Sequence, residues 1–138
     1  MKWMIASDIH GSAYYCRMLL ERFKEENADR MLLLGDILYH GPRNDLPKEY
    51  APKEVISMLN GIKEYILCVR GNCDTEVDQM VLDFPVLADY AVIFDGKTTV
   101  YATKSTSDKN VKETEEVEKC MVAVDGLRFR AQSSTDST

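Results

Sequence analysis

The stretch KWMIASDIHG, residues 2–11, contains the pattern on which the predicted fold depends. Its first half, from Trp3 to Ser7, is largely apolar and is typical of a buried β-strand. Asp8 and His10, whose side chains can bind metal ions, follow at the point where this strand should end. The stretch therefore predicts a strand that leads directly into a polar turn.

Two later stretches repeat this order. Residues 31–34 and residues 65–69 are apolar runs, as expected for strands that are covered on both faces. Asp36 follows the first run and Asn72 follows the second, each directly after a glycine. Each of the three predicted strands thus ends beside side chains that can bind a metal ion.

Helical patterns separate these strands. Behind Ser12, a residue that can cap a helix, apolar side chains recur with the spacing i, i+3, i+4, i+7. Pro52 suits the first turn of a second helix, which Gly61 should end. This βαβαβ alternation predicts an α/β domain with a parallel sheet, whose ligands bind outside the carboxyl ends of the strands. The side chains expected to converge there are Asp8, His10, Asp36 and Asn72.

A short third helix is expected next. Val77, Met80 and Val81 mark its apolar positions, before a proline that should end it. Asp74 is expected mainly as the cap of this helix, with Thr75 as the alternative.

Two β-hairpins are predicted in the C-terminal third. Asp-Gly pairs at 95–96 and 125–126 stand between apolar runs, which is a strong signal for a tight turn. The chain changes in character over residues 104–131, and the polar tail 132–138 is expected to be disordered. Since no boundary between domains is evident, a single domain is expected over residues 1–138.

Composition limits the function. The chain has 138 residues, of which 45% are hydrophobic, and a net charge of −6. Such a chain lacks the positive surface of a general nucleic-acid binder, but a bound metal ion can still attract a small phosphorylated substrate. The four cysteines form no CxxC pair, which favours reduced thiols and a cytoplasmic location. No window approaches the ~20 apolar residues of a membrane span, so no membrane association is expected.

The converging side chains suit a centre of two metal ions. Asp8 and His10 can reach one ion, and Asp36 can bridge two ions with its two oxygens. Asn72 can offer its amide oxygen to the second ion. Ions about 3.5–4 Å apart can hold a hydroxide between them and polarise a phosphoryl group. Taken singly, each residue could instead cap a helix or shape a turn, but the set as a whole favours the metal centre.

Two residues in the loop after the second strand are candidates for substrate binding. His40 should face the same edge of the sheet, although a loop histidine is more often an ordinary surface residue. Arg43 could contact a phosphate, or it could pair with Asp45 instead.

The motifs together resemble the calcineurin-like metallophosphoesterase superfamily and, within it, the small bacterial and archaeal phosphodiesterases of the YfcE type. The resemblance spans residues 1–103. It implies an αββα sandwich, a dinuclear centre of divalent metal ions (commonly Mn²⁺) and hydrolysis of small phosphodiesters. The motifs that carry it are Asp8-Ile9-His10-Gly11, Gly35-Asp36 and Gly71-Asn72-Cys73-Asp74.

Residue roles follow from the same resemblance. It implies that Asp8, His10, Asp36 and Asn72 are metal ligands and that Asp36 bridges the two ions. Cys73 stands where many members of the superfamily have a histidine that is expected to act as an acid, and this replacement is familiar in the YfcE type.

The resemblance ends after Thr103. The family continues with a Gly-His segment and a Gly-His-Thr-His segment, whereas this chain reads Lys104-Ser105-Thr106-Ser107 and has no later histidine. The missing ligands should weaken metal binding, and Lys104 should bring a positive charge to the centre.

Three hypotheses follow from this difference. The first is a metal-dependent phosphodiesterase, to which a second copy of the chain could add residues. The second is a non-catalytic scaffold or binding module with a degenerate metal site. The third is an inactive truncated product, from a shifted reading frame or a misassembled gene.

Overall fold

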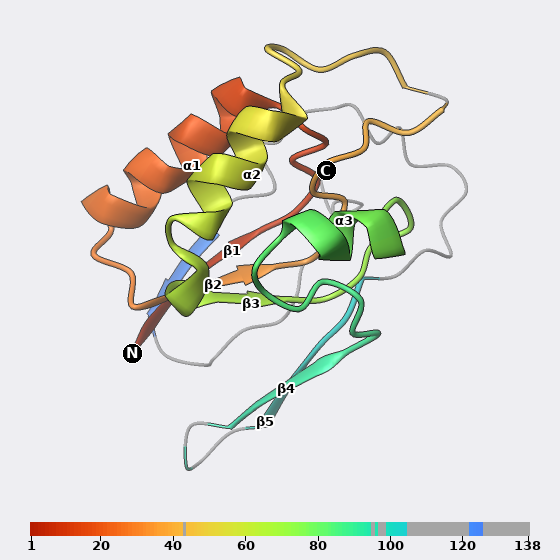
Figure 1. Cartoon of the computed structure of the whole chain (residues 1–138). Helices are drawn as coiled ribbons and strands as arrows, with labels where there is room; N and C mark the ends of the chain where they lie inside the picture. Colours follow the sequence, from red (N-terminus) through yellow and green to blue (C-terminus); the bar gives the residue numbers. More distant parts are fainter. Residues whose placement is uncertain (43, 95, 97–98, 105–121, 126–138) are drawn as a thin grey trace, which may run out of the picture.

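A four-stranded sheet forms the centre of the computed structural model, which describes residues 1–42, 44–94, 96, 99–104 and 122–125 (Figure 1). The strands lie in the order β3-β2-β1-β6, and a separate two-stranded sheet pairs β4 with β5. In chain order the elements are β1 (Lys2–Ala6), α1 (Ala13–Glu25), β2 (Arg30–Leu33), α2 (Pro52–Asn60), the 3-10 helix η1 (Lys63–Tyr65), β3 (Ile66–Cys68), α3 (Glu76–Val81), β4 (Ala91–Phe94), β5 (Thr99–Ala102) and β6 (Val122–Asp125).

The strands β1, β2 and β3 are parallel, which confirms the predicted α/β fold with a parallel sheet. At their carboxyl ends, Ala6 pairs with Leu33 and Leu33 pairs with Cys68. The three strands therefore end at the same level, and the turns that follow them lie at one edge of the sheet.

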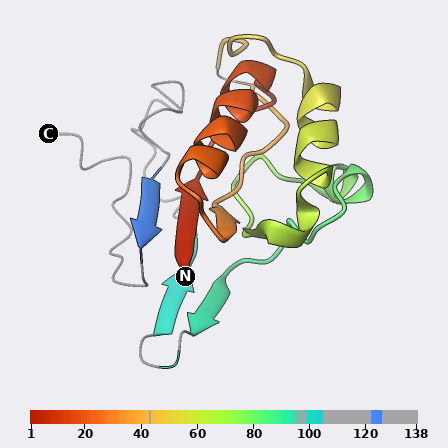
Figure 2. The ribbon, with the colours of Figure 1, turned by 90° about the vertical axis from the view of Figure 1, so that its left-hand side faces the viewer.

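The two predicted hairpins have different outcomes. The first is confirmed, because β4 and β5 are antiparallel and Val92 lies opposite Tyr101. The first half of the second forms β6, which joins the main sheet antiparallel to β1 (Figure 2). The expected return strand, residues 127–129, and the tail 132–138 lie outside the described residues.

The helices α1 and α2 lie side by side over one face of the sheet (Figures 1 and 2). Met4 and Leu33 of the sheet belong to the same buried cluster as Leu19 of α1 and Val55 of α2. As predicted, Ser12 caps α1, since its side-chain oxygen accepts a hydrogen bond from a backbone N–H in the first turn.

The hairpin β4–β5 packs on the other face of the sheet. Trp3 and Leu32, which alternate with the helix-facing residues along their strands, form a second buried cluster with Ile93 and Ala102. Helices, main sheet and hairpin therefore form three successive layers of the predicted αββα sandwich.

In the third helix, α3, the buried side is not the apolar side that the sequence pattern indicates. Val77 is 67% exposed and Met80 is 83% exposed, whereas the buried side chain of α3 is Asp78. The carboxylate of Asp78 accepts a hydrogen bond from the backbone N–H of Thr75, the residue before the helix. This polar contact helps to hold the short helix, while Val77 and Met80 point outward.

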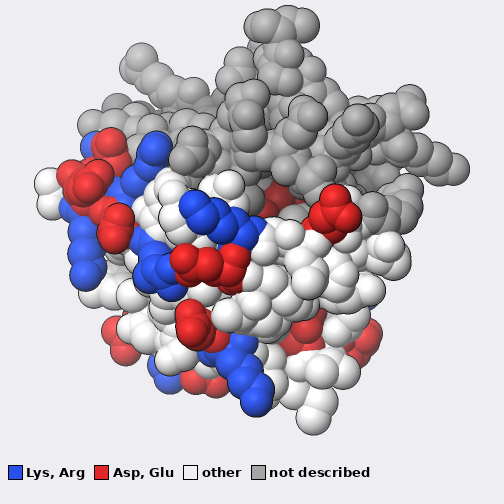
Figure 3. Space-filling view, turned by 90° about the horizontal axis from the view of Figure 1, so that it is seen from above, with Lys and Arg blue, Asp and Glu red and all other residues white. Residues whose placement is uncertain are grey.

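No helix among the described residues is long and apolar enough to cross a membrane. On the face seen from above, basic and acidic side chains are interspersed (Figure 3).

Candidate metal centre

The turns after β1 and β2 bind each other through their backbones. The N–H of Asp8 donates to the carbonyl oxygen of Gly35 at 3.1 Å, and the N–H of His10 donates to the carbonyl oxygen of Asp36 at 2.9 Å. These bonds continue the parallel pairing of the two strands beyond the sheet. They bring the candidate ligands of both turns to the same place.

Three residues of these turns have a left-handed backbone. The φ angle is 64° at Asp8, 49° at His10 and 56° at Asp36. Positive φ is uncommon outside glycine, and among the described residues Asn27 and Glu49 are the other non-glycine cases. Such conformations cluster at functional sites, where surrounding bonds hold them in place. The backbone thus marks the same three residues that the sequence predicts as ligands.

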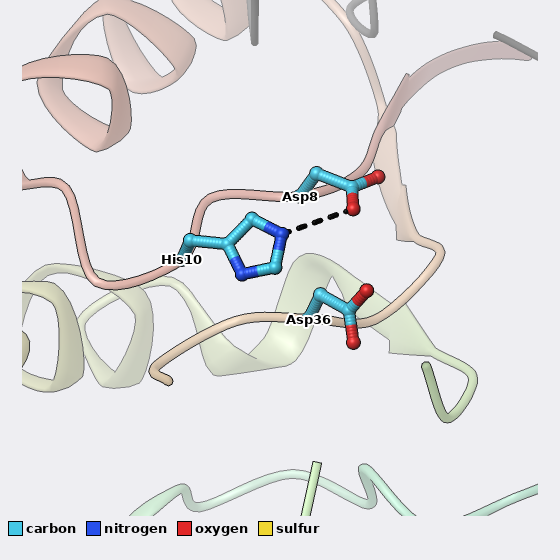
Figure 4. A group of neighbouring side chains, drawn as sticks. All are labelled: Asp8, His10 and Asp36. Atoms are coloured by element: carbon cyan, nitrogen blue, oxygen red, sulfur yellow. Dashed lines mark hydrogen bonds and ion pairs between the residues drawn. The ribbon is translucent and has the colours of Figure 1, made fainter. Parts of the chain in front are cut away.

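The three side chains point toward one another (Figure 4). One possible ligand atom of each lies within 4.8 Å of the others. His10 Nε2 is 3.1 Å from Asp8 Oδ1, and Asp36 is fully buried. Two carboxylates and an imidazole at such separations could hold a divalent metal ion.

The orientation of His10 is fixed by the loop after β2. Its Nδ1 lies 2.7 Å from the carbonyl oxygen of Tyr39. Because a carbonyl accepts hydrogen bonds, Nδ1 must carry a proton, and in the neutral ring Nε2 then keeps its lone pair. In this structure Nε2 lies 3.1 Å from Asp8 Oδ1, an acceptor, so it carries a proton as well, and it would have to release that proton to bind a metal ion.

Asp74 ties the third turn to the second. Its carboxylate accepts hydrogen bonds from the backbone N–H groups of Asp36 (2.8 Å), Ile37 (3.1 Å) and Gly71 (2.7 Å). The expectation that Asp74 mainly caps α3 is wrong, because Thr75 holds that position. The physical reason is that three backbone donors from two turns are buried around this carboxylate, which is 1% exposed.

Glycine is required where these two turns cross. Gly35 has a φ of 88°, and a Cβ added there would lie 2.6 Å from the Cα of Gly71. A Cβ added at Gly71 would lie 2.7 Å from the Cγ of Asp36. Real Cβ atoms do not approach other atoms so closely. The bare backbone at both positions therefore allows Asp36 to reach the centre.

Two further contacts orient the carboxylates. The Ser7 hydroxyl donates to Asp8 Oδ2 at 2.5 Å, and the backbone N–H of Cys73 donates to Asp36 Oδ1 at 2.7 Å. Each carboxylate therefore has one oxygen held by the protein and its other oxygen turned to the centre. Neither contact is predicted by the sequence motifs, although Ser7 and Cys73 both stand next to predicted ligands.

Lys104 enters the centre from the hairpin side. Its ammonium nitrogen lies 2.6 Å from Asp8 Oδ1 and also forms an ion pair with Asp36 Oδ2. The lysine stands two residues beyond the end of β5. The expected positive charge at the centre is thus present, in direct contact with both candidate carboxylate ligands.

These contacts shift the ionisation of every group in the centre. Burial would raise the pKa of Asp8, but the hydrogen bond with His10 and the charge of Lys104 outweigh it and hold that pKa well below its usual range. Burial would lower the pKa of His10, but its bonds to Asp8 and to the Tyr39 carbonyl raise it overall. The pKa of Asp36 is raised because burial outweighs the adjacent ammonium. Burial opposes the charge of Lys104, yet the two carboxylates raise its pKa.

The remaining predicted site residues lie in two neighbouring loops. Asn72 is exposed in the turn after β3 and lines a pocket of about 270 Å³ together with Tyr39 and Cys73. His40 is half-buried, and its ring lies edge-on to the rings of Tyr39 and Tyr50, with centroids 4.9 Å and 5.2 Å away. Metal binding by Asn72 and substrate binding by His40 stay predictions. Arg43 lies outside the described residues.

The fold and this set of turns are those of a known family. A family model of the calcineurin-like phosphoesterases matches residues 1–125. The chain therefore belongs to the calcineurin-like phosphoesterase family, as the motifs predict.

Its similarity to particular members is high over the N-terminal part. The phosphodiesterase YfcE of Escherichia coli strain K12 is 47% identical over 103 residues, which make up 75% of this chain and 56% of that protein. The protein of the same name from E. coli O157:H7 matches to the same extent. The chain thus spans little more than half the length of the curated relatives that it matches.

Solved structures agree with this assignment. The structure of YfcE, a phosphoesterase from E. coli, matches with a TM-score of 0.75 at 45% identity, over 77% of this chain and 58% of that one. An archaeal phosphodiesterase matches with a TM-score of 0.52 at 21% identity, over 75% of this chain and 58% of that one. The second match shows the shared fold alone.

Proposed function

We propose that this chain is a metal-dependent phosphodiesterase whose metal ions are bound at the carboxyl edge of the sheet. The observation that carries the proposal is the convergence of Asp8, His10 and Asp36, each in a left-handed backbone conformation that neighbouring bonds support. The similarity to a bacterial phosphodiesterase supports the reaction class.

The donor set suits divalent ions that accept both oxygen and nitrogen ligands, and Mn²⁺ is the first candidate. Asp8 and His10 would hold one ion, Asp36 would bridge, and Asn72 would serve the second ion. When bound, the ions would polarise the phosphoryl oxygens and lower the pKa of a water between them. The N–H of Cys73 keeps the Asp36 carboxylate in a single orientation for this role.

The pocket beside the centre suits the organic part of a small phosphodiester. Aromatic, amide and hydroxyl groups surround it, and none of the lining residues carries a charge. The backbone of Cys73 connects the pocket to the centre through its bond to Asp36. We propose that His40 and Arg43, in the loop that borders the pocket, contact the phosphate. The lining residues are Tyr39, Gly41, Pro42, Asn44, Asn72, Cys73 and Thr75.

A second candidate function is a non-catalytic binding module with a degenerate metal site. The ammonium of Lys104 between Asp8 and Asp36 favours it, because this cation already pairs with both carboxylates. The two candidates differ in whether the chain binds divalent ions and turns over a substrate.

Hydrolysis of bis(p-nitrophenyl) phosphate tests the proposal. We expect activity with Mn²⁺, none after treatment with EDTA, and a loss of about 100-fold or more in Asp36→Asn, which keeps the shape of the side chain and removes its charge. Asp89→Asn, a change at an exposed carboxylate, is the matched control and should keep full activity. Activity that survives Asp36→Asn would show a contaminant, and Mn²⁺ binding without turnover would favour the binding module.

A further inference from the structure

We propose that Lys104 is a built-in competitor of the metal ion, so that its ammonium and a divalent cation occupy the space between Asp8 and Asp36 alternately. This inference rests on the proposed metal centre and concerns what controls its occupancy. The lysine would then set the metal affinity of the site, and its charge would offset part of the negative charge of the centre whenever no metal is bound.

The atoms involved are the same for both cations. Lys104 Nζ lies 2.6 Å from Asp8 Oδ1, the oxygen that also faces His10 Nε2 at 3.1 Å. The same ammonium contacts Asp36 Oδ2, while Asp36 Oδ1 is engaged by the backbone of Cys73. The ammonium therefore binds the oxygens that are left for a metal ion.

Simultaneous binding is excluded by distance and charge. A metal ion would need bonds of about 2.0–2.2 Å to these oxygens, which would place it in the space that the ammonium fills. Two cations so close together would also repel each other strongly where burial weakens screening. An ion that enters the centre must therefore displace Lys104.

Displacement is feasible because the lysine reaches the centre from the surface. The side chain of Lys104 is 17% exposed and that of Asp8 is 18% exposed, whereas Asp36 is fully buried. A flexible four-carbon stem can withdraw its ammonium into water, where the charge is well solvated. The apparent metal affinity then equals the intrinsic affinity multiplied by the fraction of molecules in which the lysine has left the site.

Calorimetric titration of the metal-free chain with Mn²⁺ tests the competition. Lys104→Met keeps most of the apolar stem of the side chain and removes the ammonium group. We therefore expect Mn²⁺ to bind at least about tenfold more tightly, as relief of a well-populated competitor requires. Lys53→Met, at an exposed position on α2, changes the net charge equally and should bind Mn²⁺ as the unmodified chain does.

A second measurement on the unmodified chain keeps the test independent of the variant's folding. Reductive methylation, followed by mass spectrometry, should leave the Lys104 amine protected in EDTA and should modify it once Mn²⁺ is added. Lys53 should be modified at the same rate in both conditions.

The outcomes separate this inference from the proposed function. The competition would be refuted if Lys104→Met bound Mn²⁺ equally or more weakly, or if methylation of Lys104 did not depend on the metal. Either result would still be compatible with the metal centre. Absence of Mn²⁺ binding in both the unmodified chain and Lys104→Met would refute the metal centre itself, and the competition with it.

Discussion

The turns at the carboxyl edge of the sheet and the outer face of the β4–β5 hairpin are stabilised in opposite ways. In the turns, buried carboxylates such as Asp74 accept hydrogen bonds from backbone N–H groups of neighbouring turns. On the hairpin, Val92, Phe94 and Tyr101 are 51%, 68% and 72% exposed, and no described element covers them. The fold therefore holds the site together with internal polar bonds and leaves apolar surface at its periphery.

The largest effect is expected from Asp74→Ala, which removes the acceptor for three backbone N–H groups. Buried donors without partners are costly, so we expect the free energy of unfolding to fall by about 3–5 kcal/mol. Urea denaturation monitored by circular dichroism measures it. Glu25→Ala, at an exposed position near the end of α1, should stay within about 0.5 kcal/mol. A small effect at Asp74 would mean that the turns do not depend on this carboxylate.

The second largest effect is a difference in stability between substitutions on the two sides of the β4–β5 hairpin. Ile93→Ala removes a side chain buried between the hairpin and the main sheet, and we expect a loss of about 2–4 kcal/mol. Phe94→Ala, on the outward side, removes a larger side chain but should cost less than about 1 kcal/mol. Thermal unfolding of both variants measures the contrast. Equal losses would show that the outer face is covered in solution.

Gly71→Ala tests the close crossing of the turns. The added methyl group would meet the carboxylate of Asp36, so we expect a loss of about 1–3 kcal/mol in stability and weaker Mn²⁺ binding. Gly61→Ala, at the end of α2, is the control because its φ of −64° suits alanine. Its stability should change by less than about 1 kcal/mol. An intact Mn²⁺ affinity in Gly71→Ala would show that the crossing does not position Asp36.

The smallest effect concerns pH. His10 has a pKa raised above its ordinary value of 6.5, so the proton is held more tightly in the folded chain than in the unfolded one. Its contribution to stability is present below pH 6.5 and is lost as pH rises through the folded-state pKa. In EDTA, the free energy of unfolding should therefore decrease as pH rises above 6.5, by at most about 1.4 kcal/mol per pH unit. His10→Gln should remove this decrease in the free energy of unfolding with pH. A decrease that persists in the variant would show that another group causes it.

Much of the fold could be predicted because its signals are local. Apolar runs, the cap at Ser12 and Pro52 in the first turn of α2 each depend on a few neighbouring residues. The rule that parallel strands end at one edge then brings Asp8 and Asp36 together without knowledge of packing.

What could not be predicted depends on contacts between distant parts. The role of Asp74 follows from two turns that cross closely, not from its position before α3. The outward apolar side of α3 goes with polar bonds that hold this helix, such as the one from the backbone N–H of Thr75 to Asp78. Neither can be read from periodicity.

The strands, the helices and the candidate ligands can be predicted from the sequence, because they follow from the chemistry and spacing of adjacent residues. Which groups share the centre depends on how distant parts of the chain pack together. Asp8 and Lys104 are 96 residues apart and meet because the chain returns to the sheet edge beyond the hairpin. Their contact arises from layer packing and from the attraction of opposite charges in a partly buried place, and a linear sequence specifies neither directly.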